Sequence, residues 1–348
     1  MSAGTAGLQS CTDPTKKRGK FKVGLIANGP KNDWGYNSAH EKARLFLQQT
    51  LDQDITTQLI ENVPETADAT RVIERIVQLG TKLVFATSFG YQDTVYDLAG
   101  KYTDVQFLQA WGFKKRLNMG AFSAKMYEAW YVVGMVAGLM SKSGHFGVVA
   151  AHPIPPMKWQ INAFLLGARS VKPETTASVI FINKWSDASL AAEATSALIE
   201  QGADVVTGVL DSSISVAQTA EARGVYVVGH NTDLSRFAPT KILTGTEWLW
   251  GGLYVQAAKD VLGGAQFNGK HYFGGLREGY VGYLPISAWV SEQAKTAAAQ
   301  AADKIRNGSL SVYAGPIVDN TGVVRIKAGV VPTHDEIMNI DWFVQGVR

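Results

Sequence analysis

The stretch Lys22–Arg44, KVGLIANGPKNDWGYNSAHEKAR, contains a strand, a loop and a helix in a pattern that recurs along the chain. Apolar and β-branched residues at 21–27 have the length of a buried parallel strand and stop at a turn-forming sequence, 28–30. Helical spacing begins at Tyr36, and Asp33 is placed to cap that helix. Because ligands bind outside the carboxyl ends of the strands in open α/β sheets, we expect the loop to face a ligand. The candidate contacts in this loop are Asn32, Asp33, Trp34, Tyr36 and Asn37.

The same alternation of strand and helix occurs in two series. In the first we expect strands at 55–60, 82–86, 105–110 and 120–123, and helices at 67–79 and 94–102. In the second we expect strands at 146–150, 178–182, 204–209 and 225–228, and helices at 157–169, 188–201 and 214–223. Alternation of this kind implies parallel sheets with right-handed crossovers. The sequence therefore predicts an α/β protein with two doubly wound parallel-sheet lobes, and a largely apolar helix at 127–141 buried within one domain or between two.

The remainder of the chain follows the pattern less regularly. We expect a strand at 242–246, a loop at 247–250, a helix at 254–262, a strand at 271–273 and a long helix at 287–305. The expected division is a head at 1–19, lobe one at 20–124 plus about 243–275, lobe two at 125–242 plus about 276–312, and an extended tail at 313–348 that packs on the lobes.

Length and composition indicate a globular protein of two domains. A chain of 348 residues exceeds what one core usually holds, and its apolar content of 46% and charged content of 18% are those of a folded protein. The net charge of +3 comes from 33 basic and 30 acidic residues that are scattered, so nucleic acid is not expected as a partner. No stretch beyond the head approaches the ~18 consecutive apolar residues of a membrane helix.

The chain has one cysteine, Cys11, in the head MSAGTAGLQSCTDPTKKRGK. It cannot form an internal disulfide or a cysteine-based metal site. The sequence Leu8–Cys11 resembles the end of a bacterial lipobox, which makes Cys11 a candidate for lipidation. However, the ten preceding residues contain no apolar segment of an export signal. Either the start is truncated or replaced, or the cysteine is incidental.

No catalytic or metal motif is present. The six histidines show no His-Glu-x-x-His spacing, and no phosphate-binding glycine motif or nucleophile elbow occurs in the chain. We therefore expect no metal, no cofactor and no enzymatic activity. His152 and His230 follow expected strands, and packing or solvation is the favoured interpretation of both.

Further candidate site residues follow other strands: Phe89, Tyr91, Glu128, Trp185, Asp211, Asn231 and Trp248. One of Phe89 and Tyr91 could pack beneath its loop. Glu128 heads the apolar helix, and its buried carboxylate needs a partner, either a ligand N–H or a hinge arginine. Asp211 either caps the next helix or contacts the ligand. Trp248 is two residues from a second tryptophan, and we expect at most one of the two to line a cleft.

A series of short motifs carries a resemblance to a known family. The motifs are NDWGYN at 32–37, SFGYQD at 88–93, YEAWYVVG at 127–134, WSD at 185–187 and AGPIVD at 314–319. In this order and spacing the chain resembles the BMP family, the basic membrane protein and purine nucleoside receptor A-like substrate-binding lipoproteins of ABC importers. The resemblance implies the periplasmic-binding-protein type I fold, with two α/β lobes, three hinge crossings and a ligand held in the cleft between the lobes.

The resemblance also implies a set of ligand contacts. In nucleoside-binding members the purine ring lies between one aromatic residue from each lobe, which by position are Tyr36, with or without Trp34, and Trp185. The acidic residue that binds ribose hydroxyls in those members falls at Asn231, and a neutral amide lacks the strength of a charge-assisted hydrogen bond. This departure favours a purine base or a related flat heterocycle. A second departure is at 247 and 248, where this chain has Glu247 and Trp248 and nucleoside binders tend to have a lysine nearby.

The leading interpretation is therefore an extracytoplasmic receptor, periplasmic or anchored as a lipoprotein. It would act as a monomer and deliver a purine-type molecule to the permease and ATPase subunits of an ABC importer. The alternative is a cytoplasmic two-lobed α/β enzyme or a small-molecule sensor that acts on a nucleoside or sugar. A regulator of this fold should carry a DNA-binding helix-turn-helix, for which the head of about twenty residues is too short.

Overall fold

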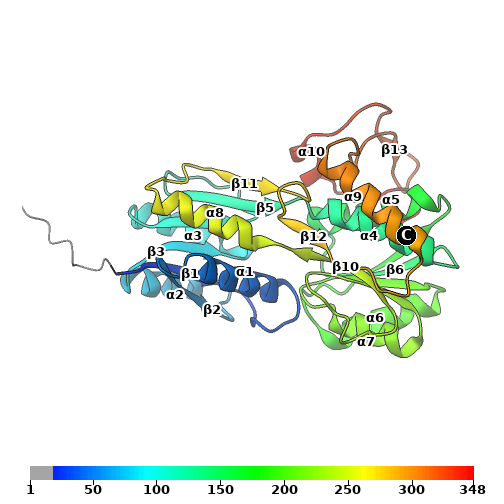
Figure 1. Cartoon of the computed structure of the whole chain (residues 1–348), viewed down its shortest axis with the longest axis horizontal. Coiled ribbons are helices and arrows are strands. Elements are labelled where there is room, and N and C mark those ends of the chain that lie inside the picture. The colour runs from blue at the N-terminus through cyan, green and yellow to red at the C-terminus, as the bar shows by residue number, and fades with distance from the viewer. Residues whose placement is uncertain (1–18) are drawn as a thin grey trace, which may run out of the picture.

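A computed structural model describes residues 19–348, so Cys11 and its lipobox-like sequence lie outside the described residues. The chain forms two α/β lobes that lie side by side (Figure 1), each built on a six-stranded sheet. The strand order is β11-β5-β4-β3-β1-β2 in the first sheet and β12-β10-β9-β8-β6-β7 in the second. All neighbouring strands pair in parallel except β10 and β12. The predicted fold class, two doubly wound lobes, is confirmed.

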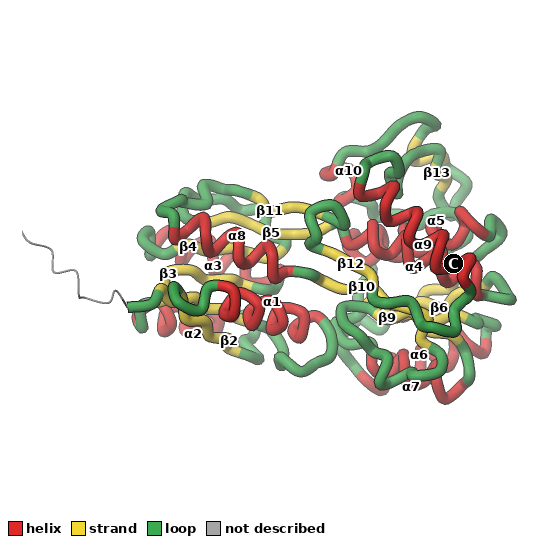
Figure 2. The backbone as a smooth tube through the Cα atoms, in the orientation of Figure 1, coloured by secondary structure: helices red, strands yellow, loops and turns green. Residues whose placement is uncertain are grey.

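Lobe one has helices on both faces of its sheet, as Figure 2 shows. Alternate strand residues point to opposite faces: Val23 and Leu25 belong to the core under α1 and α8, whereas Val84 and Ala86 belong to the core under α2 and α3. The elements are β1 (Phe21–Ile26), α1 (Tyr36–Thr50), β2 (Ile55–Ile60), α2 (Ala67–Gln78), β3 (Thr81–Ala86), a 3-10 turn (Phe89–Tyr91), α3 (Gln92–Lys101), β4 (Gln106–Ala110), β5 (Met119–Ala124), α8 (Trp250–Leu262) and β11 (His271–Gly274).

Lobe two has the same layered arrangement. The apolar helix α4 packs closely on α5, because Gly134 and Gly167 leave room for backbone at the crossing: a Cβ on Gly134 would lie 2.1 Å from the carbonyl oxygen of Phe164. The elements are α4 (Met126–Met140), β6 (His145–Ala150), α5 (Pro155–Val171), β7 (Thr176–Phe181), α6 (Ala188–Glu200), β8 (Val205–Val209), α7 (Ile214–Arg223), β9 (Tyr226–Gly229), β10 (Ile242–Trp248), β12 (Val281–Tyr283) and α9 (Glu292–Arg306).

Within residues 19–348 the chain passes between the sheets three times, from β5 to α4, from β10 to α8 and from β11 to β12. The boundary expected near 243 is therefore wrong, because β10 pairs along its length with strands of the second sheet and the chain crosses only at Leu249. The expected loop at 247–250 is wrong for a related reason. Antiparallel pairing with β12, a strand that the sequence pattern did not predict, extends β10 to Trp248.

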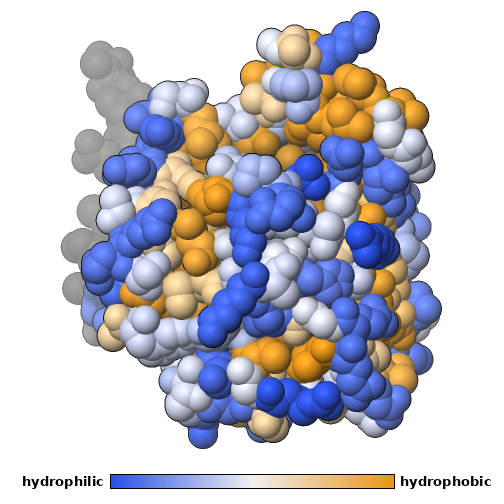
Figure 3. All heavy atoms as spheres, turned by 90° about the vertical axis from the view of Figure 1, so that its right-hand side faces the viewer, coloured by the Kyte–Doolittle hydropathy of each residue, from blue (hydrophilic) through white to orange (hydrophobic). Residues whose placement is uncertain are grey.

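The tail contains β13 (Ile317–Val318), β14 (Val324–Ile326) and the short helix α10 (His334–Met338), which was not predicted. It is attached to lobe two by hydrogen bonds of Asn162 to the backbone of Trp342 and Val344. Figure 3 views the end of lobe two and shows hydrophobic residues gathered toward the upper edge, at the height of the tail in Figure 1. Among the described residues, no helix has the length and apolar character needed to cross a bilayer.

Candidate functional site

A cavity of about 830 Å³ lies between the lobes, at the carboxyl ends of the parallel strands. Its volume falls in the range of small-molecule sites. Lobe one contributes the loops after β1, β3 and β4 and residues of β5 and β11 to the wall. Lobe two contributes the loops after β6 to β9 and the end of β10, and the tail contributes residues around α10. Six aromatic residues line the cavity: Tyr36, Phe89, Trp111, Phe113, Trp185 and Trp248.

Tyr36 and Trp111 are fixed to each other at the lobe-one side of the cavity. The Tyr36 hydroxyl donates to the carbonyl oxygen of Thr87 at 2.7 Å and accepts a hydrogen bond from Trp111 Nε1 at 3.3 Å. Burial raises the pKa of the Tyr36 hydroxyl, so it stays a neutral donor. The polar atoms of both side chains are thus used within the protein, and their rings are what they can offer a ligand.

Trp248 and Asn231 form a second fixed pair on the lobe-two side. Trp248 is only 6% exposed, donates from Nε1 to Asn231 Oδ1 at 2.7 Å, and stacks on Trp250 with ring centres 4.9 Å apart. The Asn231 amide donates in turn to the carbonyl oxygens of Leu210 at 2.8 Å and Asp211 at 3.1 Å. Asn231 lines the cavity, but its donor and acceptor are already bonded to protein. The amide therefore positions neighbouring residues. The sequence had suggested a different role for Asn231, direct contact with the ligand.

Trp185 and Phe89 are the more accessible rings. Trp185 follows β7 and is 39% exposed, with its edge against His152 at 4.9 Å between ring centres. Phe89 follows β3 and is 57% exposed. Tyr91, from the same loop, is fully buried and donates from its hydroxyl to the Val63 carbonyl oxygen at 2.5 Å. Of this pair, Tyr91 is the residue that packs beneath the loop.

Trp34 lies outside the cavity, although it is as exposed as Trp185, at 38%. Its ring meets Phe237 of lobe two edge to face at 5.6 Å, and the Arg236 guanidinium lies 4.8 Å from its ring centre. Its carbonyl oxygen accepts a hydrogen bond from Thr232 Oγ1 at 2.8 Å. Trp34 is thus a contact between the lobes, and only Tyr36 of the two expected rings lines the cavity.

Asp33 is the cap that the sequence indicated, and it holds the loop before α1. Its carboxylate accepts from the backbone N–H groups of Gly35, Asn37 and Ser38 at 2.8–3.0 Å, and from the Asn37 side chain at 2.9 Å. Asn37 is buried beside it, and Asn32 is exposed. None of these three lines the cavity. They shape the loop rather than touch the space where a ligand would lie.

Glu128 lies at a crossing between the lobes and not in the cavity. Its carboxylate accepts from the backbone N–H of Leu276 at 2.8 Å, and Lys125 Nζ lies 3.9 Å away. Burial raises the pKa of this carboxyl. The partner that the carboxylate needs is therefore a backbone amide of the hinge, neither a ligand nor an arginine side chain.

Asp211 occupies the point where the two lobes touch. Its backbone N–H donates to the Trp185 carbonyl oxygen at 2.9 Å, and its own carbonyl oxygen accepts from the Tyr36 N–H at 2.9 Å. The cap of α7 is Ser213, and no side chain caps that helix, so the capping role considered for Asp211 is wrong. Asp211 lines the cavity, and burial, followed by the negative charges of Asp33 and Glu65, raises the pKa of its carboxyl to about 8.

Several lining residues were not singled out in the sequence. Trp111, Asn28 and Gln160 belong to this group, and so does the end of the tail, where His334 contacts Phe273 of lobe one at 3.7 Å between ring centres. The rule that identified Trp185 would also have identified Trp111, since both follow a parallel strand. The tail residues carried no such signal, because α10 reaches the cavity only through the tertiary fold.

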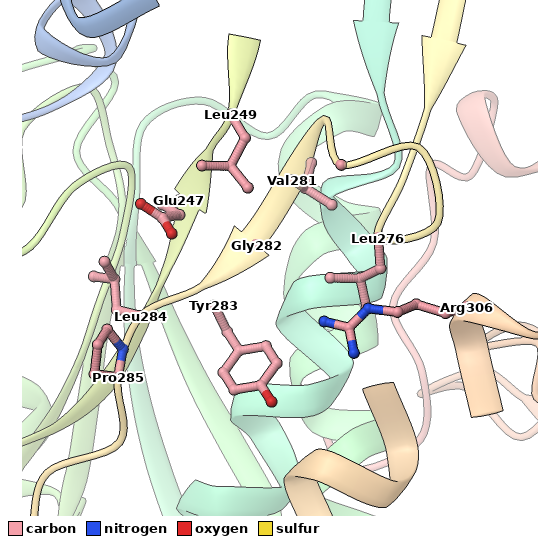
Figure 4. Close-up of a pocket in the computed structure, with 10 residues that line it drawn as sticks. Glu247, Leu249, Leu276, Val281, Gly282, Tyr283, Leu284, Pro285 and Arg306 are labelled. Atoms are coloured by element: carbon pink, nitrogen blue, oxygen red, sulfur yellow. The ribbon is translucent and has the colours of Figure 1, made fainter. Parts of the chain in front are cut away.

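A smaller cavity of about 440 Å³ lies beside the crossings between the lobes (Figure 4). Leu249, Leu276 and Val281 are among its apolar residues, and the carboxylate of Glu247 and the guanidinium of Arg306 lie on different sides. It is separate from the cavity between the lobes. In residues 19–348 no group of histidine, cysteine or acidic side chains is arranged to hold a metal ion.

Two α/β lobes, three crossings and a ligand-sized cavity between the lobes define the class of two-lobed periplasmic-type binding proteins. Solved structures share this fold: a transcriptional activator of the comK gene from Bacillus halodurans has a TM-score of 0.74, with 24% identity, 83% of this chain covered and 99% of that one. A solute-binding protein of an ABC transporter system from Conexibacter woesei has a TM-score of 0.70, with 18% identity and coverage of 84% and 98%.

The chain belongs to the Bmp family, the PnrA-like ABC transporter substrate-binding proteins, whose family model matches residues 20–315. It is 38% identical over 328 residues to a protein described as purine-binding from Brucella abortus, covering 94% of this chain and 93% of that one. It is also 34% identical over 287 residues to a candidate glucose-binding protein of an ABC transporter from Haloferax volcanii, with coverage of 81% and 71%. The family is one of substrate-binding proteins rather than enzymes.

Proposed function

We propose that this protein is the substrate-binding component of an ABC importer and that it holds a purine base, or a similar flat heterocycle, between its two lobes. In this role it captures the ligand outside the cytoplasm and delivers it to a permease driven by an ATPase subunit. Family membership and the Brucella relative described as purine-binding support the proposal. The Haloferax relative, described as a candidate glucose-binding protein, makes a sugar the competing ligand.

The composition of the cavity wall favours a flat heterocycle over a sugar. A sugar presents hydroxyls on all sides and needs many free hydrogen-bonding partners, and buried groups left unpaired are costly. Here the Asn231 amide is bonded to protein, and so are the Gln160 amide and the Ser88 hydroxyl. Six aromatic rings line the cavity. Their faces suit a base, which needs stacking on its faces and hydrogen bonds at one edge.

We place Trp185 on one face of the ligand, with Tyr36 and Phe89 on the side of lobe one. A free base fits the proposal better than a nucleoside, because Asn231 is neutral and its amide is engaged with Trp248 and the backbone of 210–211. Both Nδ2 hydrogens of Asn231 are then used within the protein, and its Oδ1 already accepts from Trp248.

Calorimetric titration of the protein with adenine, hypoxanthine, their nucleosides and glucose tests this function. We expect a free base to bind with one-to-one stoichiometry and glucose not to bind. Mass spectrometry of the recovered ligand should find it unchanged. Binding of glucose with no binding of any purine would overturn the proposed ligand, and conversion of the ligand would overturn the binding-protein role.

Attachment to a membrane through Cys11 is a separate part of the proposal. It depends on the short lipobox-like sequence 8–11. Mass spectrometry of the protein purified from membranes of its own host should find a lipidated amino-terminal cysteine, and Cys11→Ala should release the protein from the membrane fraction. An unmodified Cys11 in membrane-bound protein would contradict this assignment.

A further inference from the structure

Asp211 differs from Asn231, Gln160 and Tyr36 of the same cavity wall in what its side chain does. Among the described residues, Asn28 Oδ1 and His334 Nδ1 also belong to lining residues and have no hydrogen-bond partner. The polar atoms of Asn231, Gln160 and Tyr36 are bonded to other protein groups. In the described part of the chain, by contrast, no group forms a hydrogen bond with the carboxyl oxygens of Asp211, and no cation forms an ion pair with them. A polar group that lines a cavity without a protein partner is available to a ligand.

The backbone of Asp211 is nevertheless held in place from three sides. It donates to the Trp185 carbonyl oxygen at 2.9 Å, and its carbonyl oxygen accepts from the Tyr36 N–H at 2.9 Å and from the Asn231 amide at 3.1 Å. These three partners are themselves residues of the cavity wall. The carboxyl group is thus positioned relative to the proposed stacking rings, and it does not have to be ordered when a ligand arrives.

We propose that the carboxyl group of Asp211 recognises the edge of a purine in its neutral form, donating from its O–H and accepting at its C=O. This proposal rests on the function proposed above and specifies the chemical class of the ligand. A neutral carboxyl pairs with an edge on which a donor lies next to an acceptor, as in adenine or hypoxanthine. A carboxylate can only accept, so its negative charge would face the acceptor nitrogen of adenine and repel it.

The surroundings of Asp211 favour the neutral form at neutral pH. Burial, with the negative charges of Asp33 and Glu65 on lobe one, raises the pKa of the carboxyl to about 8. His230 lies on the adjoining loop of lobe two, and burial lowers its pKa to about 3, so it supplies no positive charge. Asp187, on the Trp185 loop, is occupied as the cap of α6, where it accepts from the Leu190 N–H at 3.0 Å. The Tyr36 hydroxyl stays protonated.

The test is calorimetric titration with adenine from about pH 6 to about pH 9. We expect constant affinity up to about pH 7, and above about pH 8 a loss that approaches tenfold per pH unit, because ionised Asp211 must regain a proton on binding. Asp211→Asn keeps a donor and an acceptor at the same place without a charge. Its affinity should not change between pH 6 and pH 9, in contrast to that of the parent, whereas Asp211→Ala should bind weakly at every pH.

A second measurement needs no ligand. Between the unfolded pKa of about 4 and the folded value of about 8, folded Asp211 keeps a proton that the unfolded chain has lost. The folded state then binds more protons, so the free energy of unfolding falls as the pH rises through this window. Asp211→Asn lacks this loss, so its melting temperature should rise relative to the parent from about pH 6 to about pH 8 and then level off.

The outcomes separate this proposal from the proposed function. If adenine binds with the same affinity from pH 6 to pH 9 and Asp211→Ala binds as well as the parent, Asp211 has no role in recognition and the purine receptor stands. If adenine binds more tightly as Asp211 ionises, the neutral form is the wrong one. If neither adenine nor hypoxanthine binds the parent at any pH, the proposed function fails and this inference fails with it.

Discussion

Trp34 and Trp185 are comparable in sequence and in exposure, but the fold gives them different partners. Each lies in the loop between a parallel strand and the next helix, Trp34 after β1 and Trp185 after β7, and they are 38% and 39% exposed. Trp34 packs on Phe237 and Arg236 of the opposite lobe, whereas Trp185 lines the cavity. A position at a strand's carboxyl end therefore places a ring at the cleft without deciding whether the ring meets a ligand or the other lobe.

The difference suggests that ligand contact and lobe contact are supplied by neighbouring but distinct residues. At the start of α1, Tyr36 lines the cavity, while Trp34 and Gly35 of the preceding loop contact lobe two. A ligand that binds only the closed form depends on both sets of residues: one set contacts the ligand, and the other stabilises the closed form. Substitutions in the two sets should therefore both weaken binding, by different routes.

Gly35→Ala should have the largest effect and acts at the contact between the lobes. A Cβ on Gly35 would lie 1.5 Å from the carbonyl oxygen of Asp211, so the lobes could not approach to the distance seen here. Inserting a methyl into a packed site costs about 1–3 kcal/mol or more, and we expect affinity to fall by about a hundredfold or more. Small-angle scattering at saturating ligand should find a larger radius of gyration than for the parent.

Gly252→Ala is the matched control, since a Cβ on this exposed residue of α8 meets no atom within 4 Å. It should bind and close like the parent. Normal affinity and a normal radius for Gly35→Ala would contradict the closed contact between Gly35 and Asp211.

Trp185→Ala should weaken ligand binding by about tenfold to a hundredfold, because stacking of one base on one ring contributes about 1–3 kcal/mol. Calorimetry measures the loss, and circular dichroism checks the fold. Trp289→Ala is the control in the same lobe: Trp289 is 42% exposed and stacks on Tyr226 at 5.5 Å, away from the cavity. Equal losses in both variants would mean that Trp185 has no special contact with the ligand.

Trp34→Ala should cost less, about twofold to tenfold in affinity, since an aromatic pair contributes about 0.5–1.5 kcal/mol. The loss arises because fewer molecules have their lobes closed. Phe237→Ala removes the same contact between the lobes, so it should produce a similar effect. The double variant should then be no weaker than either single one, because both remove the same contact. Additive losses would show that Trp34 contacts the ligand independently of Phe237.

Arg236→Ala should have the smallest effect. The guanidinium lies 4.8 Å from the Trp34 ring centre and 5.3 Å from that of Phe237, and an exposed cation–π contact contributes about 0.5–1 kcal/mol. We expect a twofold to fivefold loss of affinity, measured by the same titration. Added salt should not lower the affinity of Trp34→Ala by this amount, because that variant lacks the Trp34 ring. A loss as large as that of Trp185→Ala would place Arg236 on the ligand instead.

The sequence predicted the two lobes well because buried parallel strands leave a local pattern. The apolar run at 21–27 and the turn after it mark β1, and the helix was correctly expected from Tyr36. By contrast, β12 is three residues long and α10 five, too short to show a period. The start of α9 was expected at 287 and lies at Glu292, because an alanine-rich pattern does not show where a helix begins until a cap such as Ser291 is recognised.

The candidate site was predictable to the level of the loops but not of the atoms. The rule on strand ends brought Tyr36, Trp185 and Asp211 to one place. It could not show that the Asn231 amide is bonded to Trp248, seventeen positions further along the chain. It also could not show that Trp34 meets Phe237, because that contact depends on how the two lobes sit together.

The most direct test is a crystal structure of the protein with adenine bound. We expect the base between the lobes, with one face on Trp185, its edge within hydrogen-bonding distance of the Asp211 carboxyl, and Trp34 still packed on Phe237. A base bound outside this cavity would contradict the assignment of the site. A base in the cavity that stacks on Trp34, with Trp185 turned away from it, would contradict the distinction between the two tryptophans.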